Sequence, residues 1–128
     1  MIREAINKAL KNVSALGGRV YEAYTAPADT AAPYATVKFA TQRPSTAITF
    51  AGDNNIEVRI YGKPTSFKSL DAIEQEVINV LNDKEVEDSD GNKYYVWWVP
   101  GGADYTEDDR GLIVRLVNFA AGAMNGRG

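Results

Sequence analysis

The residues best suited to chemistry are carboxylates, which gather in two short stretches of the sequence. One stretch, residues 84–90, holds a single lysine against Glu85, Glu87, Asp88 and Asp90, and a second acidic stretch covers residues 105–110. Residues 88–92 (DSDGN) have some likeness to a calcium loop, but the glycine comes too early and no acidic residue stands at the closing position. We therefore predict a solvated hairpin turn and no metal site.

The sequence lacks the usual side chains of catalysis. It contains no histidine and no cysteine, which removes the commonest general base, the commonest zinc ligand and thiolate chemistry. No phosphate-binding P-loop is present, and Gly101-Gly102 lacks the strand–glycine–helix context of a dinucleotide site. Paired carboxylates could hydrolyse a glycoside only within a sugar-binding cleft. These residues predict a protein that is not an enzyme and holds no cofactor.

Length and composition fit one folded domain. The chain has 128 residues, 45% hydrophobic and 24% charged, so it can form a core without a metal or disulfide. Its net charge of −3 argues against a non-specific nucleic-acid binder. No apolar run approaches the roughly 20 residues that span a bilayer, and the N-terminal pattern does not resemble a signal peptide. We expect no membrane association.

The clearest pattern is a strand, a turn and a helix over residues 55–82. Ile56, Val58 and Ile60 alternate with polar residues, as in a strand with one buried face. Residues 62–64 (GKP) break the strand. A helical stripe at steps of three and four then follows, which consists of Phe67, Leu70, Ile73, Val77, Val80 and Leu81.

The remaining patterns complete an α+β domain. An apolar stripe over residues 2–16 predicts a helix that ends at Gly17-Gly18, and strands are expected at residues 19–24, 34–41, 93–99 and 111–120. Residues 100–102 (PGG) are expected to end the strand at 93–99. We predict a single α+β domain over residues 1–120, with a mixed, mainly antiparallel sheet of about five strands. Both helices should pack on one face. Residues 121–128 should form a flexible tail.

The sheet face without helices should carry tyrosine, threonine, lysine and perhaps tryptophan, and a partner could dock there. Trp97-Trp98 has two interpretations, core plus sheet surface or an interface anchor, and we favour one tryptophan in each role. Nucleic-acid bases could stack on the neighbouring aromatic residues, but no basic cluster flanks them.

Residues 42–55 also allow two interpretations. They form either a bent hairpin whose ends belong to the main sheet, or a projecting β-hairpin arm that docks on a neighbour. Within them, residues 46–50 (TAITF) have the composition of a strand.

Several stretches resemble the phage tail-completion proteins of the tail-terminator, or head-to-tail joining, group. These are the helix closing on residues 17–21 (GGRVY), the strand entry 32–37 (APYATV), residues 58–63 (VRIYGK) leading into the second helix, and the closing strand 110–119. The resemblance covers nearly the full length and consists of turn and packing residues. The acidic hairpin and the aromatic run 94–98 have no counterpart in the family pattern.

The resemblance implies a structural virion protein without catalytic residues. Such subunits form a ring, usually of six copies, at the head-proximal end of the tail tube, where the ring stops tube polymerisation and docks on the head connector or stopper protein. Genomic DNA passes through the ring without specific binding, and assembly takes place in the host cytoplasm. Alternatives are another neck component, such as a head-closure stopper or adaptor, or a small ligand-binding domain.

A ring of identical subunits needs two different patches on each copy. The candidate interface residues are Thr46, Ile48, Phe50, Trp97 and Trp98. The candidate lumen-lining acids are Glu85, Glu87 and Asp88, whose charge would repel passing DNA.

Overall fold

The computed structural model describes residues 2–22, 31–43, 53–64, 67–107 and 111–123. Two α-helices, one short 3-10 helix and six strands occur in these residues. In chain order they are α1 (Ile2–Leu10), η1 (Ser14–Leu16), β1 (Val20–Glu22), β2 (Tyr34–Arg43), β3 (Asp53–Gly62), α2 (Phe67–Leu81), β4 (Lys84–Glu87), β5 (Lys93–Glu107) and β6 (Leu112–Ala123). No helix in these ranges is long and apolar enough to cross a membrane.

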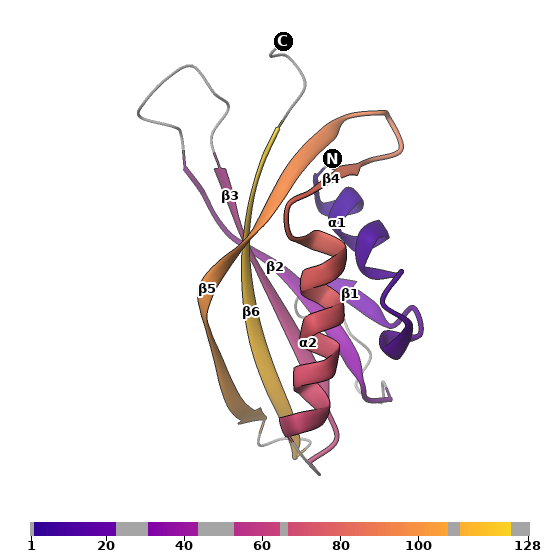
Figure 1. Cartoon of the computed structure of the whole chain (residues 1–128), viewed down its shortest axis with the longest axis vertical. Helices are drawn as coiled ribbons and strands as arrows, with labels where there is room; N and C mark the ends of the chain where they lie inside the picture. The colour runs from indigo at the N-terminus through magenta and orange to yellow at the C-terminus, as the bar shows by residue number, and fades with distance from the viewer. Residues whose placement is uncertain (1, 23–30, 44–52, 65–66, 108–110, 124–128) are drawn as a thin grey trace.

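The six strands form one strongly twisted sheet in the order β1-β2-β3-β6-β5-β4. Only β1 and β2 are parallel, and every other neighbouring pair is antiparallel. Both helices lie on the same side of this sheet (Figure 1). The predicted α+β class with helices on one face is confirmed, and the sheet has six strands, with β4 and β5 on the two sides of the predicted hairpin turn.

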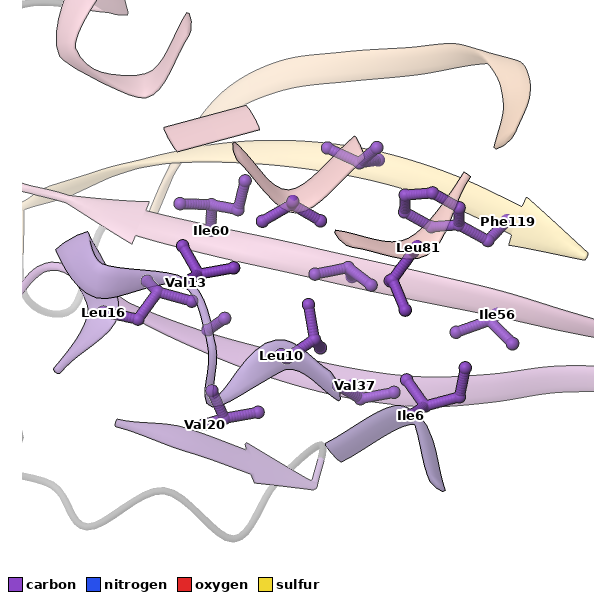
Figure 2. Packing of buried hydrophobic residues seen from close by; sticks show 14 of the residues in the cluster. Ile6, Leu10, Val13, Leu16, Val20, Val37, Ile56, Ile60, Leu81 and Phe119 are labelled. Atoms are coloured by element: carbon purple, nitrogen blue, oxygen red, sulfur yellow. The ribbon is translucent and has the colours of Figure 1, made fainter. Parts of the chain in front are cut away.

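The core fills the space between the helices and the sheet. Every second residue of β3 and β6 points into it, because side chains of a strand alternate between faces. Figure 2 shows Ile56 and Ile60 of β3, Phe119 of β6 and Leu81 of α2 among these side chains, all at most 1% exposed. Burial of such side chains contributes roughly 1.5–3 kcal/mol each before the entropy cost, so this layer holds the domain together.

The predicted N-terminal helix is shorter than expected. It ends at Leu10, and Val13 has an extended backbone with φ −80° and ψ 106° before the 3-10 turn begins. Val13 and Leu16 are still buried, because the turn returns their side chains to the core. Gly17 follows with a left-handed φ of 55°, as the glycine stop predicted.

The prediction that residues 100–102 end a strand is wrong. β5 continues through them to Glu107, with a shift in its pairing to β6 between Val99 and Ala103. Two glycines make this bulge possible, because Gly101 has a φ of +116° and a Cβ at Gly102 would clash with the Leu116 carbonyl oxygen. Residues 105–107, expected in an acidic loop, are therefore part of the sheet.

The last strand also continues beyond the expected start of the tail at residue 121. β6 ends at Ala123, and Ala121 is completely buried against the core. Residues 124–128 lie outside the described residues, and so do residues 44–52 of the predicted arm. The flanking strands stay paired as far as Arg43 and Asp53.

Candidate functional site

The sheet face turned away from the helices, here called the open face, carries aromatic and polar side chains. Strand register and alternation place these residues on it: Tyr21, Tyr34, Thr36, Lys38, Glu57, Arg59, Tyr61, Tyr95, Trp97, Val99, Tyr105, Val114, Leu116 and Asn118. The prediction that tyrosine, threonine, lysine and tryptophan share the face without helices is confirmed.

A row of tyrosines crosses one end of the open face. Tyr34 pairs with Tyr61, Tyr61 with Val114, and Val114 with Tyr105, on four adjacent strands. The rings of Tyr34 and Tyr61 are stacked with centroids 4.5 Å apart, and Tyr21 meets Tyr34 edge-on at 6.3 Å. These contacts fix the rings on a rigid strand framework. Tyr34 is only 4% exposed and Val114 is buried, so Tyr61 and Tyr105 supply the accessible part of this row.

Arg59 lies at the centre of the open face. Its Nε donates a hydrogen bond to the Tyr105 hydroxyl at 2.8 Å, and its guanidinium forms an ion pair with Glu57 at 2.8 Å. Burial lowers the pKa of Arg59, but the bonds to Glu57 and Tyr105 outweigh burial and raise it overall. Arg59 therefore stays positively charged on the open face, and the carboxylate of Glu57 partly neutralises that charge.

The two adjacent tryptophans point to opposite faces. Trp97 lies half-buried on the open face, with its ring 5.9 Å from that of Tyr95. Trp98 is on the helix side but remains 39% exposed. The favoured interpretation, in which one tryptophan belongs to the core, is wrong because Phe119, the β6 residue opposite Trp98, fills that part of the core.

Trp98 stands beside an unpaired strand edge. β4 pairs only with residues 93–96 of β5, so residues 97–107 have no strand on their outer side within the part of the chain that is described. The backbone N–H of Trp98 on this free edge has no strand partner and donates to the Asn82 side-chain oxygen Oδ1 at 2.8 Å. An unpaired edge offers backbone donors and acceptors to a strand of another chain.

Asp88 does not belong with the candidate lumen acids. It is only 2% exposed, and its carboxylate accepts hydrogen bonds from the backbone N–H groups of Asp90 and Asn92, both at 2.9 Å. The Asn92 side chain and the Tyr94 hydroxyl add two more bonds, at 3.0 and 3.4 Å. Asp88 thus shapes the hairpin turn, and only Glu85 and Glu87 present exposed carboxylates.

A charged cluster that the sequence prediction missed ties the helix layer to β5. Arg115, on the helix side of β6, bonds to Asp104 of β5 and to Glu74 and Asp71 of α2, the last at 2.9 Å. The bond to Asp104 is the main cause of a raised Arg115 pKa and outweighs burial, which lowers it. The one signal in the sequence is a lone arginine within an apolar strand.

The structure describes only some of the predicted interface residues. Trp97 and Trp98 lie close together in the sequence but on different surfaces, whereas Thr46, Ile48 and Phe50 lie outside the described residues. Glu85 and Glu87 are exposed on β4, where Glu85 forms an ion pair with Lys93 at 3.6 Å. Their roles as lumen or interface residues stay predictions.

Comparison with known proteins gives a structural match but no sequence family. No protein-family model matches the chain, and no curated protein does. The fold is similar to that of a chain from the virion of a native gene transfer agent (GTA) particle, with a TM-score of 0.68 and 16% sequence identity. The match covers 93% of this chain and 91% of that chain, so the two share essentially one complete fold.

Proposed function

We propose that this chain is a structural protein of a phage-like virion. Support comes mainly from the fold, which matches a gene transfer agent virion chain over nearly the whole length of both chains. The open face and the free β5 edge are also surfaces suited to protein contacts. A structural role without catalysis agrees with a sequence that has no histidine and no cysteine.

More specifically, the protein forms a ring, usually of six copies, at the head-proximal end of the tail tube. The ring ends tube polymerisation and joins the tail to the head connector or stopper protein. It is assembled in the host cytoplasm and remains in the virion. The free β5 edge supports an assembly in which neighbours meet through unlike patches, and the open face is then available to the tube or the connector.

Particles made without the protein test this role. We expect overlong tails in negative-stain images, because nothing stops tube growth. Tails of normal length that never join heads would instead identify a head-closure stopper or adaptor, the second candidate. Complete, infectious particles would overturn both roles.

The exposed hairpin acids supply a test of the lumen proposal. Glu85 and Glu87 would line the channel, where their charge keeps DNA from adhering. The double variant Glu85→Gln/Glu87→Gln, with Asp88 left to hold its turn, should assemble normally but slow DNA ejection. Glu76→Gln on α2 is the control and should eject at the wild-type rate. Normal ejection by the double variant would exclude the lumen role.

A further inference from the structure

Charge is distributed unevenly across the fold. Residues 1–43, which supply α1, β1 and β2, contain six basic and three acidic residues. Residues 67–107, which supply α2, β4 and β5, contain three basic and ten acidic residues, of which four lie in the 84–90 stretch that contacts α1. The free part of β5, residues 97–107, has two acidic residues and no basic one. The free β5 edge and the α1–β1 flank lie on opposite sides of the molecule (Figure 1).

The basic flank contains a groove of about 490 Å³ between α1 and β1. It is lined by Arg3, Glu4, Asn7, Lys8, Lys11 and Glu22. Arg3 is held at its rim by an ion pair with Glu22 at 2.8 Å and by the Phe39 ring, 4.9 Å from the guanidinium carbon. The groove therefore combines apolar side-chain stems with a cationic rim.

One atom in this groove lacks a partner. The side-chain oxygen of Asn7 is buried and accepts no hydrogen bond in the described structure. Buried acceptors are rarely left unpaired, because losing water without a replacement bond is costly. Because this oxygen is buried, a donor from outside the subunit reaches it only when the Asn7 side chain rotates toward the groove.

The acidic flank offers such a donor. Trp98 on the free β5 edge is 39% exposed, and an indole N–H can only donate. On the same face, Asp104, Glu74 and Asp71 surround Arg115, which lies four positions along β6 from Phe119, the residue opposite Trp98. Three carboxylates share one guanidinium there and leave an excess of two negative charges. A large ring and excess acid on one face complement a groove with a basic rim.

We propose, on the basis of the proposed ring function, that copies join head to tail through these two flanks. Trp98 of one copy occupies the α1–β1 groove of the next, where its indole N–H bonds to the Asn7 side-chain oxygen after that side chain rotates into the groove. The acidic cluster faces Lys8 and Lys11. This contact brings the free β5 edge beside the outer edge of β1, so the sheets can continue from one subunit to the next. Each copy carries both surfaces, so the same contact can repeat from one copy to the next and close into a ring.

Two variants each remove one side of this junction. Trp98→Ala deletes the occupant, and Lys8→Glu/Lys11→Glu reverses the rim charge. Each should weaken self-association at least about tenfold, the loss expected when one central anchor is removed. Lys63→Glu, beyond the end of β3 and away from the junction, is the control and should associate like the wild type. Native mass spectrometry, alone and with tail tubes, measures association, and circular dichroism checks folding.

Mixing the two junction variants gives the decisive result. Trp98→Ala retains its groove and the lysine variant retains its tryptophan, so the mixture should form heterodimers although each variant alone stays monomeric. A monomeric mixture, under conditions where wild-type chain forms rings, would place the junction elsewhere and leave the ring function intact. Wild-type chain that stays monomeric even on tail tubes would overturn both proposals.

Discussion

The two faces of one sheet differ in how they are completed. The helix face carries branched aliphatic residues and Phe119, which α1 and α2 cover, whereas Trp98 on the same side stays exposed. The open face carries a stacked tyrosine pair, Trp97 and an arginine held by Glu57 and Tyr105. Aliphatic side chains gain only from burial, whereas tyrosine, tryptophan and arginine tolerate water and still bind strongly when covered. The first face is therefore built to fold the chain, and the second is suited to meeting other chains.

Removing one large aromatic residue from each face tests this contrast most strongly. Phe119→Ala should lower the free energy of unfolding by about 3–5 kcal/mol, because it leaves a cavity beneath the helices. Trp97→Ala should lower it by about 1 kcal/mol or less, because its side chain already contacts water. Urea denaturation of the two variants gives both values. Equal losses would contradict the assignment of separate roles to the faces.

The two faces should also differ in how much an arginine on each contributes to stability. Arg115→Ala should cost about 1–3 kcal/mol, because Asp104 and Glu74 then lose their common partner in a site only partly open to water. Arg59→Ala on the open face should cost about 0–1 kcal/mol, since Glu57 can be solvated there. Thermal unfolding followed by circular dichroism would rank them, and a larger loss for Arg59 would reverse the comparison.

In the acidic hairpin, a buried carboxylate and an exposed one stand at neighbouring positions and should also differ in their contribution to stability. Asp88→Asn should destabilise the fold by about 1–2 kcal/mol, because an amide cannot accept all the bonds that this carboxylate receives. Glu87→Gln, at an exposed neighbouring position, should change stability by no more than about 0.5 kcal/mol. Chemical denaturation of both variants measures the difference. A neutral Asp88→Asn variant would restore Asp88 as a candidate lumen acid.

The smallest expected effect concerns Glu4 and depends on pH. Its hydrogen bonds to Ser89, which join α1 to the hairpin, lower the Glu4 pKa. A lowered pKa in the folded state means stability that is present above the unfolded pKa and lost as pH falls through the folded one. Glu4→Gln should therefore melt slightly below the wild type at about pH 7 and together with it at about pH 3. A constant difference across that range would exclude the ionised carboxylate as the cause.

Much of the fold follows from local patterns in the sequence. The alternation of Ile56, Val58 and Ile60, the helical stripe of α2 and the left-handed glycine after η1 each depend on neighbouring residues only. Such patterns report which face of an element is apolar, so they predict two helices over one side of a sheet. They also predict the composition of the opposite face, where Tyr34, Thr36 and Lys38 are found.

The position of each side chain within the site depended on tertiary structure. The strand through Gly101-Gly102 persists because β6 approaches close enough to pair on both sides of the bulge. Arg115 meets Glu74, 41 residues away in the sequence, because α2 crosses that strand. Local sequence sets which elements form, whereas contacts between distant elements decide which charges are neutralised, which aromatic rings are covered and which strand edge stays unpaired.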